Sequence, residues 1–343
     1  MDAGIDVAGV KRSFGAVRAV QQVTFTALPG RVTGLVGPNG SGKTTLMLML
    51  ASLLQPDEGE LRIGGIDPVS DPAGARRLLG WMPDSLGAWP SLTSREVLVA
   101  TAQLYDLSRD DARARADHLL DLVDLGALAA SPARVLSRGQ KQRLALARAL
   151  VHDPRVLLLD EPASGLDPQA RIALRVLLRR LAAEGRTILI SSHVLAELEE
   201  VVDDAVFMVD GRTVGTDRVA AAATRVRVWR VRVPADVSRS MDAVRDDVAA
   251  ALGRTTGEVR VDRRDVLVPF ADEAGAVAGL RSLMAAGLPI VEFAPAVGDL
   301  EHAFLDLKAD VSPPAPGDAD TLATDPAPPA APPSDRADDG SAS

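Results

Sequence analysis

Short β-branched and aliphatic runs alternate with longer segments rich in Ala, Leu and Arg from Ile5 to about Thr216. This alternation is typical of strands and helices arranged around a largely parallel sheet. We expect buried central strands at Val32–Val36, Val156–Leu159 and Thr187–Ser191. The expected helices, several of them preceded by an acidic or hydroxyl residue, are Ala112–Leu125, Gln140–Val151 and Pro168–Ala183. The pattern predicts an α/β domain over residues 1–218.

A second pattern begins near Thr224. Val226–Val233 alternates Val with Arg as a strand does, and Val237–Leu252 has helical periodicity. A hairpin, a helix and a closing strand are expected to follow, at Glu258–Asp262, Val266–Phe270, Ala274–Ala286 and Ile290–Phe293. The order βαββαβ predicts a small α+β domain of the ferredoxin-like type over residues 224–308.

The last segment, residues 309–343, has a different composition. Pro, Ala, Asp and Ser dominate it, and large apolar side chains are almost absent. Such a segment cannot bury enough apolar surface to offset its chain entropy, so we expect a disordered tail. Composition favours a solvated extension over a docking arm.

Charge and composition exclude several function classes. The formal net charge of -9 argues against a surface that neutralises nucleic-acid phosphates, so no nucleic-acid partner is expected. Cysteine is absent, which excludes disulfides, thiolate zinc sites and thiol nucleophiles and suits a reducing compartment. Met1–Asp6 lacks the features of a secretory signal, so a cytoplasmic location is expected. The longest strongly apolar stretch, Leu46–Leu54, is shorter than the roughly 20 residues of a membrane span, which predicts peripheral membrane association through a partner.

A phosphate-binding motif follows the strand Val32–Val36. It fits the pattern G-x-x-x-x-G-K-[ST] and precedes the helical segment Leu46–Leu54; its residues are Gly37, Pro38, Asn39, Gly40, Ser41, Gly42, Lys43, Thr44 and Thr45. The glycines let backbone N–H groups converge on phosphate oxygens, and the following helix adds its positive dipole end. Lys43 supplies a charge to the β- and γ-phosphates of ATP, and the Thr44 hydroxyl is suited to ligate Mg²⁺. The strand and helix context favours this site over a simple glycine turn.

Two carboxylates end the apolar strand that starts at Val156. Asp160 is suited to hold Mg²⁺ through water, and Glu161 to polarise a water for in-line attack on the γ-phosphate. Buried strands often end in acids, so this pair becomes a strong signal only together with the phosphate loop. The two motifs predict an ATPase that uses ATP and Mg²⁺.

A third motif carries a resemblance to a known family. Leu136-Ser137-Arg138-Gly139-Gln140-Lys141-Gln142-Arg143 resembles the signature LSGGQ-x-QR of ABC ATPases, with Arg138 in place of the first of the two glycines. Ser137 is also suited to cap a helix, but the order of the motifs favours the family. The resemblance implies a P-loop NTPase fold with a mixed-sheet core, a β-subdomain and a helical subdomain that carries the signature.

Further residues match motifs of this family in order. Ser164-Gly165-Leu166-Asp167 resembles the D-loop, which implies that Asp167 belongs to the nucleotide site. His193 resembles the H-loop switch, which contacts the γ-phosphate and Glu161. The other histidines, His118, His152 and His302, are interpreted as structural.

Two family positions leave alternatives open. Phe14 lies where the family places an aromatic that stacks on adenine, although a core Phe is the alternative. Asp84 corresponds to the family's Q-loop glutamine. A carboxylate there can bind Mg²⁺ directly or through water, and we expect activity with altered metal coupling.

The resemblance also implies partners. Ser137, Gly139 and Gln140 of one copy would close over ATP held by another, which predicts a homodimer. The segment from Asp84 to Tyr105, with Trp81, Trp89 and Leu92, is the expected contact for a separately encoded integral-membrane permease, and burial of these side chains is the alternative.

The end of the chain narrows the group. Leu300-Glu301-His302-Ala303-Phe304-Leu305 is similar to a motif of ABC-2-type and daunorubicin-resistance exporter subunits. This similarity implies an exporter, and the cargo is not readable because the membrane subunit recognises it. Two other classes stay open, a soluble ABC ATPase acting on ribosomes or DNA and a nucleotide-gated regulator without turnover. Glu161 with His193 weighs against the regulator.

Overall fold

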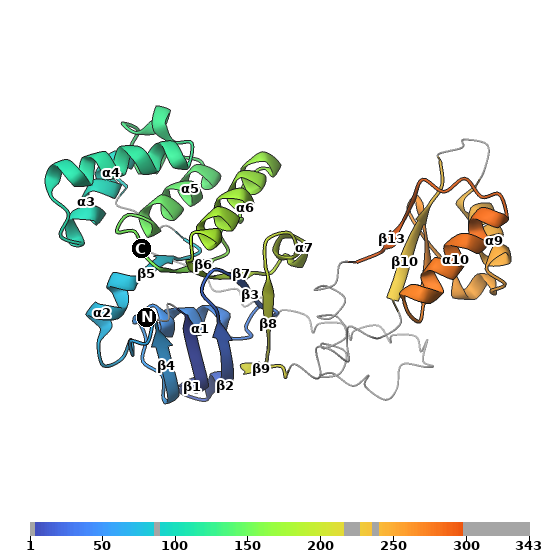
Figure 1. Cartoon of the computed structure of the whole chain (residues 1–343), viewed down its shortest axis with the longest axis horizontal. Coiled ribbons are helices and arrows are strands. Elements are labelled where there is room, and N and C mark those ends of the chain that lie inside the picture. Colours follow the sequence, from blue (N-terminus) through green and yellow to red (C-terminus); the bar gives the residue numbers. More distant parts are fainter. Residues whose placement is uncertain (1–3, 86–89, 216–226, 235–239, 298–343) are drawn as a thin grey trace, which may run out of the picture.

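The structure is a computed structural model that describes residues 4–85, 90–215, 227–234 and 240–297, with the side chains of residues 196 and 197 left aside. Its larger sheet has nine strands in the order β4-β1-β2-β9-β8-β3-β7-β6-β5 (Figure 1). The expected mixed sheet is therefore confirmed. None of the described helices is both long enough and apolar enough to span a membrane.

The parallel part of this sheet forms the core. It consists of β5 (Leu79–Met82), β6 (Val156–Asp160), β7 (Thr187–Ser192), β3 (Val32–Val36) and β8 (Asp204–Val209). Every residue of β3, β6 and β7 is buried. Continuous burial is expected when helices cover both faces of a parallel sheet, and it explains why these strands are apolar runs.

The antiparallel part is the β-subdomain. It contains β1 (Ile5–Phe14), β2 (Val17–Ala27) and β4 (Glu58–Ile63), while the short β9 (Arg212–Thr213) joins β2 to β8. Helix α1 (Lys43–Leu50) packs against it, with Leu46 and Leu50 in one apolar cluster with β1, β4 and the parallel strands. This packing anchors the start of α1, where the phosphate loop ends.

The remaining helices of the larger unit include the predicted helical subdomain. They are α2 (Pro72–Leu78), α3 (Ser94–Leu104), α4 (Arg109–Leu122), α5 (Arg138–Ala149), α6 (Pro168–Ala183) and α7 (Leu195–Glu199), with short 3-10 turns η1 (Gly126–Leu128) and η2 (Ala133–Val135). Helices α3, α4 and α5 gather together in green in Figure 1. Their apolar faces share one cluster with one face of the parallel strands, including Leu98, Leu119 and Leu144. The signature segment begins α5, so this subdomain carries it.

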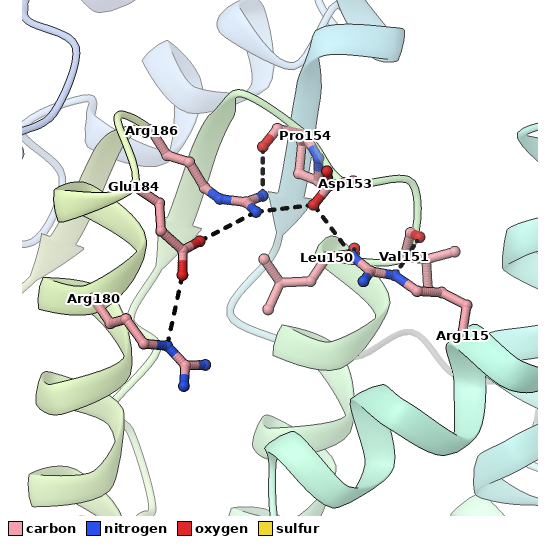
Figure 2. Close-up of polar contacts among 8 residues, drawn as sticks. All are labelled: Arg115, Leu150, Val151, Asp153, Pro154, Arg180, Glu184 and Arg186. Carbon is pink, nitrogen blue, oxygen red and sulfur yellow. Dashed lines mark hydrogen bonds and ion pairs between the residues drawn. The ribbon is translucent and has the colours of Figure 1, made fainter.

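A polar network ties α4 to the end of α5 (Figure 2). Arg115 of α4 donates from Nε to the Val151 carbonyl at 3.1 Å and from Nη2 to the Leu150 carbonyl at 2.8 Å. Asp153 Oδ1 lies 3.4 Å from Arg115 Nη2 and 2.9 Å from Arg186 Nη2. Arg186 lowers the pKa of Asp153 through a hydrogen bond to the carboxylate, more than any other group does. One carboxylate therefore links the helical subdomain to the turn before β7.

The second unit has its own sheet and its own apolar cluster. Its elements are β10 (Arg227–Arg232), α9 (Met241–Ala251), η3 (Thr256–Glu258), β11 (Arg260–Asp262), β12 (Asp265–Phe270), α10 (Glu273–Ala285) and β13 (Glu292–Pro295). The strand order β11-β12-β10-β13, antiparallel throughout, confirms the ferredoxin-like βαββαβ arrangement. Val231, Val248, Val268 and Leu283 are buried in its core.

Several expected limits differ by a few residues because of local capping. Helix α4 ends at Leu122, before the positive φ of 54° at Asp124, and not at Leu125. Glu258 was expected to begin a strand, but it closes a capping box with Thr255 in a 3-10 turn. The closing strand starts at Glu292 and not at Ile290, whose side chain packs against the second core. The limits 1–218 and 224–308 stay predictions, and the tail 309–343 and the motif from Leu300 to Leu305 lie outside the described residues.

Candidate active site

The phosphate loop connects β3 to α1, and two of its glycines are required by close backbone contacts. A Cβ on Gly37 would lie 2.4 Å from the Met208 carbonyl oxygen. Gly42 has a φ of 95°, and a Cβ there would lie 2.3 Å from the Ala19 carbonyl oxygen. The loop lies so close to β2 and β8 that only glycine fits at these two positions. Lys43, Thr44 and Thr45 of the first turn of α1 line the cavity that the loop borders, and the N–H groups of a first helical turn have no partner within the helix.

Lys43 is buried at the first position of α1. Its Nζ donates to the carbonyl oxygens of Gly37 at 2.7 Å and Pro38 at 3.1 Å. Burial lowers the pKa of Lys43, while the nearby carboxylates of Glu161 and Asp160 raise it in part. The lysine is thus a desolvated cation held beside two acids, a setting in which phosphate oxygens are strong alternative partners.

Asp160 and Thr44 bring two oxygen donors together from distant parts of the chain. Thr44 Oγ1 lies 3.2 Å from Asp160 Oδ2. The other carboxylate oxygen, Oδ1, accepts a hydrogen bond from Ser191 Oγ at 2.5 Å. Asp160 and Ser191 are opposite each other in the parallel register of β6 and β7, which explains the contact. Thr44 and Asp160 line the same cavity as Lys43.

Glu161 turns the chain sharply after β6. Its φ of 51° is in the left-handed region, which is unusual for a residue with a side chain. Its backbone N–H donates to Ser191, and its carbonyl oxygen accepts a hydrogen bond from Gln142 Nε2 at 2.8 Å. Its carboxylate Oε2 lies 2.9 Å from His193 Nδ1. Glu161 and His193 therefore form an acid–imidazole pair just past the carboxyl ends of β6 and β7.

These groups border one cavity of about 530 Å³. Ten predicted site residues line it, namely Asn39, Gly40, Gly42, Lys43, Thr44, Thr45, Asp84, Asp160, Glu161 and His193. Gly37, Pro38 and Ser41 do not line the cavity but shape the loop, because the first two hold Lys43 and Ser41 is buried beside Gly37.

The other predicted site residues do not line this cavity. Ser137 and Gln140 form the capping box of α5, with Gln140 N–H donating to Ser137 Oγ at 3.2 Å, and Gly139 lies inside the first turn. Asp167 caps α6 through the Ala170 N–H at 2.8 Å. Phe14, 48% exposed, ends β1 with the Arg12 guanidinium 4.9 Å above its ring. For these residues a role in nucleotide binding stays a prediction.

Several cavity residues were not predicted. Val17, Arg18 and Ala19 of β2 line it, as do Arg138 and Ser164. Gln142 and Ser191 hold the backbone and side chains of the acids without lining the cavity. Ser191 was detectable, because two adjacent parallel strands that end together bring their last residues side by side. Arg18 has no such signal, since only the fold brings β2 to the phosphate loop.

Comparison with known proteins assigns this arrangement to a family. The ABC transporter family matches residues 20–164. The daunorubicin resistance ATP-binding protein of Streptomyces coeruleorubidus is 32% identical over 311 residues, covering 90% of this chain and 97% of that protein. The chain belongs to the ABC transporter ATP-binding proteins.

Two further relatives extend the match. The Nod factor export ATP-binding protein I of Burkholderia lata is 41% identical over 212 residues, which cover 62% of this chain and 70% of that protein. A dimeric bacterial ABC transporter cassette of known structure has a TM-score of 0.57 and 26% identity over 61% of this chain and 96% of its own. As a member of the ABC transporter ATP-binding proteins, the chain binds ATP and hydrolyses it, as the motifs predicted.

The oxygen donors of this ABC protein suit a hard divalent cation. Mg²⁺ is usually held by one or two carboxylates together with substrate phosphates and water. Thr44 Oγ1 and the buried Asp160 carboxylate provide such a partial set, and Asp84 is an exposed carboxylate on the same cavity. Within the described residues no group of three or more His, Asp or Glu forms a complete cage. The residues present therefore fit a cation that takes some of its ligands from the protein and the others from the nucleotide phosphates and water.

Proposed function

We propose that this chain is the motor subunit of an exporter, which drives transport through a separately encoded integral-membrane permease. The support comes from the names of its relatives, which concern daunorubicin resistance and Nod factor export. The proposed cargo is a drug, an antibiotic or another hydrophobic compound. The proposed location is cytoplasmic, on the inner face of the membrane and bound to the permease.

The contact between Glu161 Oε2 and His193 Nδ1, 2.9 Å long, is the observation that carries the proposed mechanism. Lys43 and the N–H groups at the start of α1 bind the β- and γ-phosphates. Glu161 then accepts a proton from a water molecule aligned with the γ-phosphate. His193 orients the Glu161 carboxylate and contacts the same phosphate from its exposed position after β7.

Thr44 and Asp160 are proposed to hold Mg²⁺, with Asp84 as a further carboxylate near it. Bound Mg²⁺ would neutralise negative charge on the phosphates. The hydrogen bond from Ser191 Oγ to Asp160 Oδ1 orients the carboxylate so that its other oxygen faces Thr44. The adenine is proposed to stack on Phe14, which is exposed near the β2 residues of the cavity.

The signature segment is proposed to act in a second copy of the chain. Ser137, Gly139, Gln140 and Asp167 lie outside their own cavity, which fits residues that serve the nucleotide of a partner. The similar cassette of known structure is dimeric. If the γ-phosphate bridges two copies, ATP favours the closed dimer and hydrolysis releases it, because ADP lacks those contacts.

The permease is proposed to contact the segment from Asp84 to Tyr105. Trp81 and Leu92 are partly buried against the apolar clusters, which supports a packing role for these two side chains. Trp89 lies outside the described residues. The contact would therefore use exposed positions of this segment, such as Leu104, which is 74% exposed.

The direct test is Glu161→Gln in the full chain. Loss of the general base should lower the hydrolysis rate by about 10²- to 10⁴-fold while ATP binding persists. Phosphate release and equilibrium binding of ATP would be measured on the same preparation. Glu60→Gln is the matched control, because Glu60 is an exposed glutamate of β4 outside the cavity. Hydrolysis that survives in Glu161→Gln at the wild-type rate would disprove the assignment of Glu161 as the base.

A further inference from the structure

Arg138 replaces a signature glycine, and its side chain lies along the loop that follows Glu161. Its Nη2 donates to Ser164 Oγ at 2.6 Å. The aliphatic part covers Gly165, because a Cβ on that glycine would meet Arg138 Cδ at 2.7 Å and Cγ at 2.9 Å. Arg138 and Ser164 both line the cavity that contains Glu161 and His193. A glycine in place of Arg138 has no atoms to make any of these contacts.

The loop touched by Arg138 is a compact turn that begins at Glu161. The Ser164 N–H donates to the Glu161 carbonyl oxygen at 3.0 Å. The same oxygen accepts from Gln142 Nε2 at 2.8 Å, and the Gln142 side chain is buried. Arg138 and Gln142 are one turn apart on α5, where residues i and i+4 share a face. One face of α5 therefore holds both ends of the turn, with Gln142 bonded to Glu161 and Arg138 bonded to Ser164.

The backbone of Glu161 makes this support important for the orientation of its carboxylate. A φ of 51° is a sparsely populated conformation for glutamate, which persists only when surrounding contacts define it. The hydrogen bonds at Ser191, Gln142 and Ser164 are those contacts. Among the described residues, Arg138 is the side chain that bonds to the Ser164 end of the turn, so the turn should loosen at that end if this bond is lost.

We propose that Arg138 is a positioning residue for Glu161 of its own chain, acting through Ser164 and the turn from Glu161 to Ser164. This inference rests on the proposed role of Glu161 as the general base. It assigns to α5 a function in the cavity of its own chain, in addition to the proposed contact of its first turn with the nucleotide of a partner. An arginine that bound phosphate directly would instead govern the affinity for ATP.

The test compares Arg138→Ala, Arg138→Lys, Ser164→Ala and the double variant Arg138→Ala/Ser164→Ala in steady-state ATP hydrolysis. Arg138→Ala and Ser164→Ala should each lower kcat by about 3- to 10-fold and leave KM within about two-fold, because the lost charge-assisted hydrogen bond orients Glu161 and does not bind the substrate in this proposal. The double variant should lose no more than the larger single loss, since both changes remove one interaction. Arg138→Lys should recover part of kcat.

Arg134→Ala is the matched control. Arg134 is exposed four residues before Arg138, and its side chain has no hydrogen bond or ion pair with the described part of the chain. It should keep the wild-type kcat and KM. Thermal unfolding of each variant separates a change in kcat from misfolding, and Ser164→Ala alone tests the proposal if Arg138→Ala does not fold.

Three results would overturn the proposal. They are an increase in KM with unchanged kcat, a wild-type kcat in Ser164→Ala, and additive losses in the double variant. Glu161→Gln in the same assay keeps the two proposals apart. If Glu161→Gln hydrolyses ATP at the wild-type rate, the assignment of Glu161 as the general base is wrong. If Glu161→Gln loses hydrolysis while Arg138→Ala and Ser164→Ala keep the wild-type kcat, only the positioning role of Arg138 is rejected.

Discussion

The surroundings of His152 give it a pKa well below that of an ordinary histidine. Its ring stacks on Tyr105 with centroids 3.7 Å apart, and its Nε2 lies 3.1 Å from the Leu79 carbonyl oxygen. Burial lowers the pKa of His152 to about 4. The folded protein therefore holds a neutral imidazole that donates to Leu79, and the interpretation of this histidine as structural fits these contacts.

Acid should destabilise the protein through His152. Between pH 6.5 and 4 the unfolded chain binds a proton at His152 that the folded chain does not. The contribution of neutral His152 to the free energy of unfolding is therefore fully present above about pH 6.5 and is lost as the pH falls towards 4. The loss from pH 6.5 to 5 is at most about 2 kcal/mol. His152→Gln should show a smaller loss in urea unfolding at these two pH values. His118→Gln, on the exposed side of α4, should behave as wild type, and an unchanged pH dependence in His152→Gln would contradict the assignment.

At the scale of elements, the junction of α4 with α5 depends on carbonyl capping more than on ion pairs. Arg115 satisfies two carbonyl oxygens at the end of α5, those of Leu150 and Val151, both of which are buried residues. Its ion pair with Asp153 is 3.4 Å long, and the Asp153 side chain is 70% exposed. Exposed pairs contribute little, because water screens the charges and holding two long side chains costs entropy.

These contacts predict an order of stabilities. Arg115→Ala should lower the free energy of unfolding by about 1 to 3 kcal/mol, because two carbonyl groups lose their partner. Asp153→Asn should lower it by at most about 1 kcal/mol. The midpoint of urea unfolding for the two variants gives the comparison. A larger effect of Asp153→Asn would show that the network in Figure 2 acts mainly through charge.

At the scale of the whole molecule, the proposed dimer makes association depend on the γ-phosphate. Glu161→Gln binds ATP without turnover in this proposal, so it should form a dimer with ATP and return to a monomer with ADP. Light scattering coupled to size exclusion measures both states. Lys43→Ala is the control, because it should lose nucleotide affinity and remain monomeric with ATP. A Glu161→Gln protein that stays monomeric with ATP, even with its permease, would reject the proposed closed dimer.

Much of the site was readable because its parts are contiguous. The phosphate loop from Gly37 to Thr45 and the pair Asp160 and Glu161 each depend on neighbours a few residues away, on the strand before and the helix or turn after. The ends of helices were less accurate, since caps such as the box of Thr255 and Glu258 compete with helical or strand periodicity. The βαββαβ order was readable for the same local reason.

Sequence alone determined which chemical groups this protein carries and which elements hold them, because those features depend on short-range backbone preferences. Tertiary structure decided which groups meet. Thr44 and Asp160 are 116 residues apart, and only the order of the strands brings them within 3.2 Å. The contact of Arg138 with Ser164 likewise depends on how α5 packs against the end of β6. Packing of distant segments is governed by complementary surfaces that no local pattern specifies.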